Sequence, residues 1–286
     1  MDVYQEMLSE LRPQAEREEI FGLDSQINEI ETDLYKPLIT KRGKPLHTLS
    51  VGPPGVGKSL AGDYFISNRE VLTVPISVGE ANSFEQSFLP RFNRIRQSFG
   101  FPFVLLVDDI EDLFEGALHG GLDERVANNQ KRSHILGLLD RMQNTHGIYI
   151  LATLNHPYVT ETAFWRRFNI VYFPLPDKKQ RKHLCSQIIP QGPLSEEAYQ
   201  EILNSLTKQT AGFSFDGITN IPVFFKNRDE ALTEESYQEV IDDALRKAKQ
   251  QTNLQELKFL DDAAREITNN VRVRGEYIPF RGRSQS

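Results

Sequence analysis

Short apolar runs alternate with longer amphipathic stretches through the first part of the chain. The apolar runs, each bounded by turn residues, cover 46–51, 71–77, 103–107, 148–154 and 170–173. Helical periodicity between them covers 58–67, 84–99 and 124–143. Because strands and helices alternate, the pattern predicts an α/β fold in which helices flank both faces of a parallel sheet.

The second part of the chain has a different pattern. After Pro174-Leu175-Pro176 no further strand is predicted, and helical periodicity covers 177–189, 195–209, 215–228, 233–250 and 254–270. Ser195 and Thr233 each precede two glutamates, which is typical of a helix start. The hydroxyl oxygen accepts hydrogen bonds from the free N–H groups, and the acids oppose the helix dipole. We therefore expect a small all-α lid domain after the sheet.

These patterns predict four parts of the chain. They are a short N-terminal segment at 1–18, an α/β domain at 19–174, a helical lid domain at 175–270 and a basic C-terminal tail at 271–286. The tail carries four arginines among Gly, Ser and Gln residues: Arg272, Arg274, Arg281 and Arg283. It either binds an acidic partner or is a solvated, flexible end.

A phosphate-binding motif follows the first apolar run. Gly52-Pro53-Pro54-Gly55-Val56-Gly57-Lys58-Ser59 matches the pattern G-x-x-x-x-G-K-[ST] in full. The glycines let backbone N–H groups face phosphate oxygens, and the helix that begins near Lys58 adds the positive end of its dipole. The predicted nucleotide contacts are Pro54, Gly55, Val56, Gly57, Lys58, Ser59 and Leu60. The motif predicts binding of a nucleoside triphosphate, with Lys58 at the β and γ phosphates and Ser59 on Mg²⁺.

A pair of carboxylates completes the predicted phosphate site. Asp108 and Asp109 directly follow the apolar run 103–107, at the strand end where open α/β sheets bind ligands. We expect Asp108 to hold Mg²⁺, directly or through water, and Asp109 to orient and polarise the attacking water. The expected ligand and cofactor are therefore ATP and Mg²⁺, and the expected reaction is hydrolysis to ADP and phosphate.

Composition and charge narrow the classes of function. Among 286 residues, 39% are apolar and 26% are charged, which is ordinary for a soluble globular protein. The formal net charge of −7 argues against a nucleic-acid footprint over the whole surface, although it does not exclude a local basic channel. No apolar run is long enough for a membrane span, and the N-terminus lacks the features of a signal peptide, so we expect a cytoplasmic protein. The single cysteine, Cys185, excludes an intramolecular disulfide and a cysteine metal cluster, and its apolar neighbours predict burial.

Taken together, these motifs resemble the AAA+ ATPases, and more closely their AAA clade of unfoldases, microtubule severers and complex-disassembling machines. The resemblance runs from about Ile20 to Ala248. The matching stretches are Glu19–Leu23, Gly52–Ser59, Leu105–Leu113, Ile150–Asn155, Ala163–Phe168, Pro174–Asp177 and Ala211–Ser214. Their order and spacing are more specific than any one stretch.

The resemblance implies further site residues. Asn155 matches the polar sensor that helps to position the lytic water, and Gly22 and Gly212 match backbone positions near adenine. Arg166 and Arg167 fall where the family has arginine fingers, which reach the γ-phosphate of a neighbouring subunit. For each residue a purely structural role stays open, as a strand-end turn for Asn155 and as solvated arginines beside Trp165. If the fingers are real, the chain forms a homo-oligomeric ring, usually of six subunits in this family.

The chain departs from the family at three places. Asp109 stands where the family has Glu, so its carboxylate is one methylene shorter and hydrolysis is expected to be slow. The stretch Ile76-Ser77-Val78-Gly79-Glu80 lacks the aromatic pore residue of unfoldases, although a loop around His119-Gly120-Gly121 is an alternative pore element. The lid motif reads Ser214-Phe215-Asp216-Gly217, which differs from the family's Ser-Gly-Ala-Asp.

Two functional hypotheses follow. The first is an oligomeric Mg²⁺-dependent ATPase that couples hydrolysis to remodelling or disassembly of a protein or protein complex. The second is a regulatory or scaffolding module that binds ATP but hydrolyses it weakly or not at all. A nucleic-acid motor is disfavoured by the net acidity, and the sequence identifies no protein client.

Overall fold

The computed structural model describes residues 21–42, 45–66, 71–76, 103–113, 133, 136–137, 139–142, 148–157, 162–189, 191, 194–221 and 234–274. The chain divides into two compact units. Unit 1 comprises Met1–Gly52, Lys58–Phe173 and Ala263–Ser286, and unit 2 comprises Pro53–Gly57 and Pro174–Asp262.

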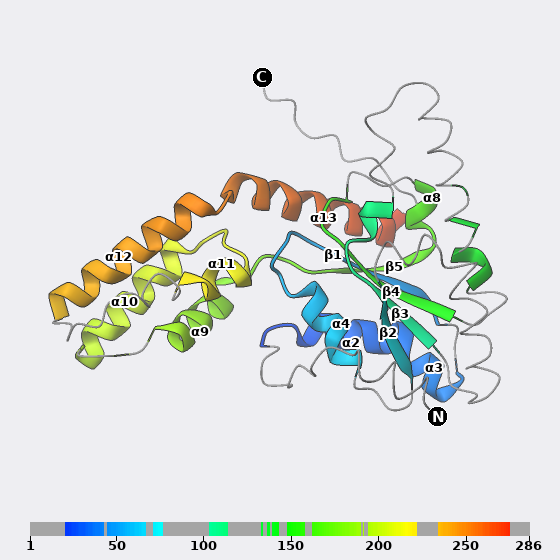
Figure 1. The fold of residues 1–286 in the computed structure, drawn as a ribbon, viewed down its shortest axis with the longest axis horizontal. Helices are drawn as coiled ribbons and strands as arrows, with labels where there is room; N and C mark the ends of the chain where they lie inside the picture. The colour runs from blue at the N-terminus through cyan, green and yellow to red at the C-terminus, as the bar shows by residue number, and fades with distance from the viewer. Residues whose placement is uncertain are drawn as a thin grey trace, which may run out of the picture. The chain divides into compact units, whose positions relative to one another are not determined.

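A five-stranded sheet forms the centre of unit 1 (Figure 1). Its strands are β1 (His47–Val51), β2 (Leu72–Ile76), β3 (Phe103–Val107), β4 (Ile148–Leu154) and β5 (Phe168–Tyr172). They lie in the order β2-β3-β4-β1-β5, and each neighbouring pair is parallel. The predicted parallel sheet is therefore confirmed, with every predicted strand present and β5 beginning two residues earlier than the sequence pattern indicated.

The two faces of the sheet bury different side chains. Odd-numbered residues of β3, such as Phe103 and Leu105, join a core cluster with Ala264 and Ile267 of α13 (Leu254–Arg274). Leu106 points to the other face, where a side chain added at Gly62 of α4 (Lys58–Ile66) would come within 2.6 Å of it. Helices therefore cover both faces of the parallel sheet, as the fully buried and continuously apolar strand β3 requires.

A segment before β1 packs on the same side of unit 1 as α4. It consists of α2 (Asp24–Ile30), η2 (Glu31–Tyr35) and α3 (Lys36–Thr40). Tyr35 is fully buried, stacks on Phe65 of α4 with ring centroids 4.2 Å apart, and shares a 2.8 Å hydroxyl hydrogen bond with Thr73 of β2. These contacts fix α4, whose first residues belong to the phosphate-binding motif, against the sheet.

Unit 2 is helical in its described part. Its helices are α9 (Lys178–Ile188), α10 (Glu196–Gln209), α11 (Phe215–Thr219), α12 (Glu234–Gln251) and the first part of α13. Ser195 caps α10 as predicted, accepting a hydrogen bond from the N–H of Ala198, and Asp177 forms a capping box with Gln180 on α9. Cys185 is buried as expected, and burial raises the pKa of its thiol.

Some predictions fall outside the described residues. These include the segment 1–18, the helix 84–99, most of the helix 124–143, the helix start at Thr233 and the loops at 77–80 and 119–121. Helix α13 continues to Arg274, so the first residues of the predicted tail are helical, and Val271 packs against the core cluster of unit 1. Within the described ranges, no helix has the length and apolar character needed to cross a membrane.

Candidate functional site

The strand order places three functional segments beside one another. Strand β4 lies between β3 and β1, and all of these strands are parallel, so their carboxyl ends meet at one edge of the sheet. Asp108 and Asp109 follow β3, Asn155 follows β4, and Gly52 follows β1. This is the edge at which open α/β sheets bind their ligands.

The glycines of the phosphate-binding loop are required by its backbone. A Cβ atom at Gly52 would lie 2.1 Å from the carbonyl oxygen of Phe173, so no larger residue fits there. Gly55 and Gly57 have φ angles of 74° and 86°, in the left-handed region that side chains disfavour. Within unit 2, Asp216 donates a backbone hydrogen bond of 3.2 Å to the carbonyl oxygen of Gly55. The loop is therefore a defined turn with a specific need for glycine.

Lys58 lies at the base of this loop with its ammonium group held inside unit 1. The residue is only 6% exposed. Its Nζ donates to the carbonyl oxygen of Gly52 at 2.8 Å and to Oδ1 of Asn155 at 2.6 Å. A positive charge is thus fixed between the ends of β1 and β4, the position from which it would meet a phosphate group.

The other motif residues differ in exposure. Pro54 is exposed, Val56 is buried, and Gly57, Ser59 and Leu60 are half-buried. Ser59 is the second residue of α4, so its hydroxyl lies in the first turn of the helix, where it was expected to bind Mg²⁺.

Asn155 connects Lys58 with the carboxylate pair. Its Oδ1 accepts from Lys58, and its Nδ2 donates to Oδ1 of Asp109 at 2.5 Å. One side chain at the end of β4 therefore joins the cation beside β1 to the carboxylate after β3. Three of the predicted catalytic residues are brought together in a single hydrogen-bonded chain.

Asp109 has an unusual backbone conformation and a perturbed carboxyl group. Its φ angle is 51°, and its N–H donates to Oγ1 of Thr153 at 2.9 Å. Although the residue is exposed as a whole, partial desolvation of the carboxyl group raises its pKa, and the charges of Asp108 and Asp112 add to this effect. Lys58 and Asn155 act in the opposite direction. The group is thus more basic than an ordinary aspartate.

Thr153 also connects the two neighbouring carboxylates. Besides accepting from the N–H of Asp109, its hydroxyl donates to Oδ1 of Asp108 at 3.4 Å. Asp108 is half-buried at the end of β3. A carboxylate at this place and the Ser59 hydroxyl are the hard oxygen ligands that suit Mg²⁺.

Sequence reasoning missed Glu111, which belongs to the same edge. It lies in η4 (Ile110–Leu113), is 2% exposed, and accepts hydrogen bonds at Oε1 from the N–H groups of Asn155 and His156, at 2.8 and 3.3 Å. Burial raises the pKa of its carboxyl group. Glu111 lies between Ile110 and Asp112, so the local sequence contains no signal that its carboxyl group would be buried.

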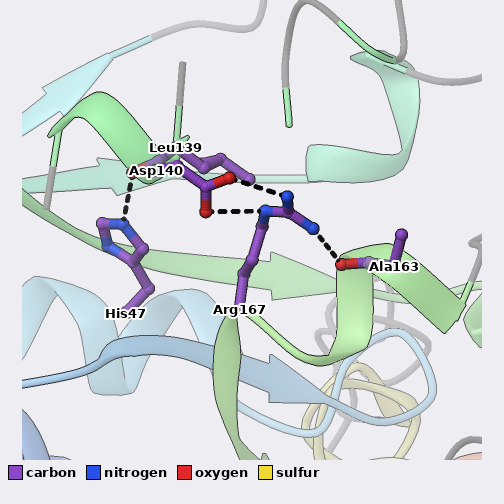
Figure 2. Close-up of polar contacts among 5 residues, drawn as sticks. All are labelled: His47, Leu139, Asp140, Ala163 and Arg167. Carbon is purple, nitrogen blue, oxygen red and sulfur yellow. Dashed lines mark hydrogen bonds and ion pairs between the residues drawn. The ribbon is translucent and has the colours of Figure 1, made fainter. Parts of the chain in front are cut away.

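The two candidate arginine fingers have different surroundings. They follow α8 (Thr162–Trp165), and Arg166 is exposed. Arg167 instead forms a two-pronged ion pair with Asp140, from Nε to Oδ1 at 2.9 Å and from Nη2 to Oδ2 at 2.7 Å, and its Nη1 donates to the carbonyl oxygen of Ala163 (Figure 2). The structure thus gives different surroundings to two arginines to which the sequence assigned the same role.

His47 lies beside this ion pair on β1 (Figure 2). Its Nδ1 accepts from the N–H of Ile150 at 3.0 Å, so Nε2 carries the proton and donates to the carbonyl oxygen of Leu139 at 3.1 Å. Burial lowers its pKa from 6.5 to about 4, an effect that the Leu139 hydrogen bond and the Asp140 charge only partly oppose. His47 is therefore a neutral structural residue at neutral pH.

The two predicted adenine contacts belong to different units. Gly22 precedes α2 in unit 1 and has a φ angle of 83°, while Gly212 lies between α10 and α11 in unit 2 and has a φ angle of 86°. In both positions the backbone conformation accounts for glycine. Their predicted roles in nucleotide binding stay predictions.

Comparison with known proteins assigns this architecture to a family. Residues 48–175 match the ATPase family associated with various cellular activities (AAA). These residues belong to the AAA family. The match covers β1 from its second residue, the phosphate-binding loop, the carboxylate pair and Asn155, and it confirms the family predicted from the motifs.

Relatives and solved structures agree with this AAA domain. The ATP-dependent zinc metalloprotease FtsH of Buchnera aphidicola subsp. Schizaphis graminum is 29% identical over 233 residues, and the match covers 75% of this chain and 36% of that protein. Cell division protein C of Sulfolobus acidocaldarius is 27% identical over 230 residues, and the match covers 73% of this chain and 58% of that protein. The chain therefore spans less than two thirds of the length of each of these relatives.

Solved structures show the same fold at low sequence identity. The FIGL-1 AAA domain in complex with ADP superposes with a TM-score of 0.63 at 16% identity, covering 93% of this chain and 96% of that chain. A structure that addresses katanin self-assembly gives a TM-score of 0.56 at 19% identity, covering 86% of this chain and 90% of that chain. The predicted sheet with a following helical part is therefore that of AAA domains.

Proposed function

We propose that this AAA domain hydrolyses ATP with Mg²⁺ at the carboxyl edge of its sheet. The observation that carries the proposal is the hydrogen-bonded chain from Lys58 through Asn155 to Asp109. It joins a phosphate-binding cation to a carboxylate able to activate water, and general-base and electrostatic assistance are the main tools of phosphoryl transfer. Family membership supports nucleotide as the ligand.

Each residue of the chain has a separate task in this proposal. Lys58 binds the β and γ phosphates, since its ammonium group already lies at the base of the loop. Asp109 accepts a proton from the attacking water, which its raised pKa favours. Asn155 orients that water through the amide group that now contacts Asp109.

The carboxylate after Asp108 is an aspartate for a local reason. Asp109 has a positive φ angle, and Asp and Asn adopt this left-handed conformation more readily than Glu does. The shorter side chain also places the carboxyl oxygen within hydrogen-bonding distance of Asn155. We therefore expect hydrolysis that is slow but dependent on Asp109.

Ser59 and Asp108 would hold the magnesium ion. Their hydroxyl and carboxylate oxygens are the ligand type that Mg²⁺ prefers, and both residues are half-buried, not sealed from solvent. The ion would neutralise charge that develops on the phosphate oxygens. Pro54, Gly55, Val56, Gly57 and Leu60 would bind the nucleotide as the motif implies, with Gly22 and Gly212 near adenine.

The active form in this proposal is a homo-oligomeric ring, with Arg166 as the finger acting on the neighbouring subunit. Arg166 is exposed, whereas the guanidinium group of Arg167 is engaged by Asp140. The likeness to a katanin structure that concerns self-assembly supports an oligomer. We expect six subunits, and a second finger role for Arg167 would require its ion pair with Asp140 to open.

The ring would remodel a protein or a protein complex. In this proposal the domain boundary lies near residue 174, and nucleotide state changes the angle between an α/β domain at 19–174 and a lid at 175–270. The likeness of this chain to cell division protein C and to the FIGL-1 and katanin structures supports this proposal. The partner is the chain itself together with a protein client of unknown identity.

Steady-state phosphate release by the purified chain tests the proposal. Wild-type protein should release phosphate from Mg²⁺-ATP, while Lys58→Ala and Asp109→Asn should reduce the rate by about 100-fold or more. Asp109→Asn should keep nucleotide affinity, because the amide retains the shape of the carboxylate. If the wild type is no faster than either variant while still binding ATP, the alternative of a binding-only scaffold replaces the proposal.

A further inference from the structure

The carboxyl group of Glu111 is buried at the edge of the sheet that carries the proposed catalytic residues. Glu111 is the second residue of η4 and is 2% exposed. A carboxyl group at such a place is unfavourable for folding unless it makes compensating hydrogen bonds. Its contacts therefore indicate what it does.

One oxygen of Glu111 binds the backbone at the end of β4. Oε1 accepts from the N–H of Asn155 at 2.8 Å and from the N–H of His156 at 3.3 Å. These are the first two residues after β4, where the backbone leaves the sheet. Two hydrogen bonds to one oxygen fix the direction of the chain at the residue whose side chain reaches Lys58 and Asp109.

The second carboxyl oxygen of Glu111, Oε2, indicates that this residue does more than stabilise the fold. Among the residues that the structure describes, Oε2 of Glu111 is buried without a hydrogen-bond partner. An unsatisfied buried polar atom opposes folding, so an apolar residue would be cheaper if only packing mattered. The compensating effect must come from the hydrogen bonds that Oε1 accepts from the backbone after β4.

We propose that Glu111 is a positioning residue that sets Asn155 between Lys58 and Asp109. The path runs from the Glu111 carboxyl group to the Asn155 N–H, and from the Asn155 side chain to Lys58 Nζ and Asp109 Oδ1. Its effect on turnover rests on the proposed hydrolysis, whereas its effect on Asn155 does not. Glu111 touches neither nucleotide nor water in this role.

Steady-state kinetics and nucleotide binding test the role in turnover. Glu111→Ala should lower kcat by about 100-fold, since a displacement of about 1 Å at a reacting group has this effect, while the Kd for a fluorescent ATP analogue should change less than threefold. Glu111→Gln should restore most of kcat because it keeps an acceptor oxygen. The matched control is Glu201→Gln on the exposed face of α10, which should leave both values unchanged.

A double-mutant cycle separates this role from general destabilisation. Glu111→Ala combined with Asn155→Ala should be no slower than Asn155→Ala alone, because both changes remove the same group from the reaction. Losses that multiply in the double variant would overturn the proposal. Where Glu111→Ala does not fold, Glu111→Asp replaces it, since the shorter carboxylate does not reach both N–H groups.

Hydrogen exchange in the nucleotide-free protein distinguishes this proposal from the proposed function. Exchange of the Asn155 and His156 amides should accelerate at least tenfold in Glu111→Ala and not in Glu111→Gln. Unchanged exchange would refute the role of Glu111 even if ATP hydrolysis is confirmed. Accelerated exchange in a chain that shows no hydrolysis would support the positioning of Asn155 while refuting the proposed function.

Discussion

Two polar networks in unit 1 differ in how completely their groups are paired. The edge network joins Lys58, Asp108, Asp109, Glu111, Thr153 and Asn155 at the carboxyl ends of the strands. The Arg167 network joins His47, Leu139, Asp140, Ala163 and Arg167 (Figure 2).

The Arg167 network matches donors with acceptors. Both ring nitrogens of His47 are used, and the Arg167 fork meets both oxygens of Asp140. In the edge network, burial and neighbouring acids raise the pKa values of Asp109 and Glu111, and Oε2 of Glu111 is without a hydrogen-bond partner within the described part of the chain. The comparison teaches that the Arg167 network has the full pairing of a structural element, whereas the edge network has the perturbed groups that we expect of a reactive site.

The largest predicted effect is the pH dependence contributed by His47. Its pKa is about 4 in the folded protein and near 6.5 when unfolded, so the unfolded state binds more protons between these values. The free energy of unfolding should therefore fall by about 3 kcal/mol in total as pH drops from about 6.5 to about 4, and His47 should add no slope above this window. Urea unfolding at pH 7 and pH 5 measures the part of this decrease that occurs above pH 5.

Two variants isolate this contribution. His47→Gln removes the titrating group, so its stability should depend less on pH than that of the wild type, although it is less stable at pH 7. Asn204→Ala, on the surface of unit 2, removes no titratable group and should keep the wild-type slope. If stability depends equally on pH in the wild type and in His47→Gln, the prediction that His47 is neutral in the folded protein is wrong.

The next effect concerns Asn155 and separates reactivity from stability. Asn155→Ala should lower phosphate release by about 100-fold, equivalent to about 2.7 kcal/mol, because the link between Lys58 and Asp109 is lost. Its free energy of unfolding should change by less than about 1 kcal/mol, since the side chain is only half-buried. The control is Asn204→Ala, whose side chain contacts Lys182 on the surface of unit 2. Turnover within twofold of the wild type would remove Asn155 from the site.

The adjacent arginines should show opposite behaviour. Arg167→Ala should lower the free energy of unfolding by about 1 kcal/mol, a modest value because the side chains of Arg167 and Asp140 are 24% and 49% exposed. Asp140→Ala should cost a similar amount, and the double variant should lose less than the sum. Arg166→Ala should unfold like the wild type but reduce turnover of mixed oligomers beyond simple dilution. The reverse assignment of the two phenotypes would contradict the comparison.

The smallest effect is expected at Thr153. Thr153→Val keeps the shape but removes the acceptor for the Asp109 N–H and the contact with Asp108. We expect about a threefold loss of turnover and less than about 1 kcal/mol of stability. Thr207→Val is the matched control, because this buried hydroxyl donates within its own helix to the carbonyl oxygen of Leu203, and it should leave turnover unchanged.

The sequence predicted the strands and the glycine loop because their signals are local. Apolar runs marked the strands, and the motif from Gly52 to Ser59 depends on residues that are adjacent in the chain. The strand order β2-β3-β4-β1-β5 has no such signal, since it depends on which strands pair after crossovers. The meeting of Lys58, Asn155 and Asp109 follows from that order.

The unpredicted parts of the candidate site are long-range or conformational. Glu111 contacts residues 44 and 45 positions away, and Arg167 binds Asp140 across 27 positions. Spacing alone could not distinguish Arg166 from Arg167 as the arginine finger. The sequence also contains no sign of the positive φ angle of Asp109, a conformation that Asp adopts more readily than Glu.

The close approach of Gly52 to Phe173 has an evolutionary consequence. Because the carbonyl oxygen of Phe173 occupies the space of a Cβ atom, the sheet itself excludes every larger residue at this position. Gly52 would thus be retained in a descendant that had abandoned nucleotides altogether. In such lineages, loss of Lys58 would indicate that nucleotide binding had been lost. A retained Gly52 would indicate only that the chain ends of two neighbouring strands still lie close together.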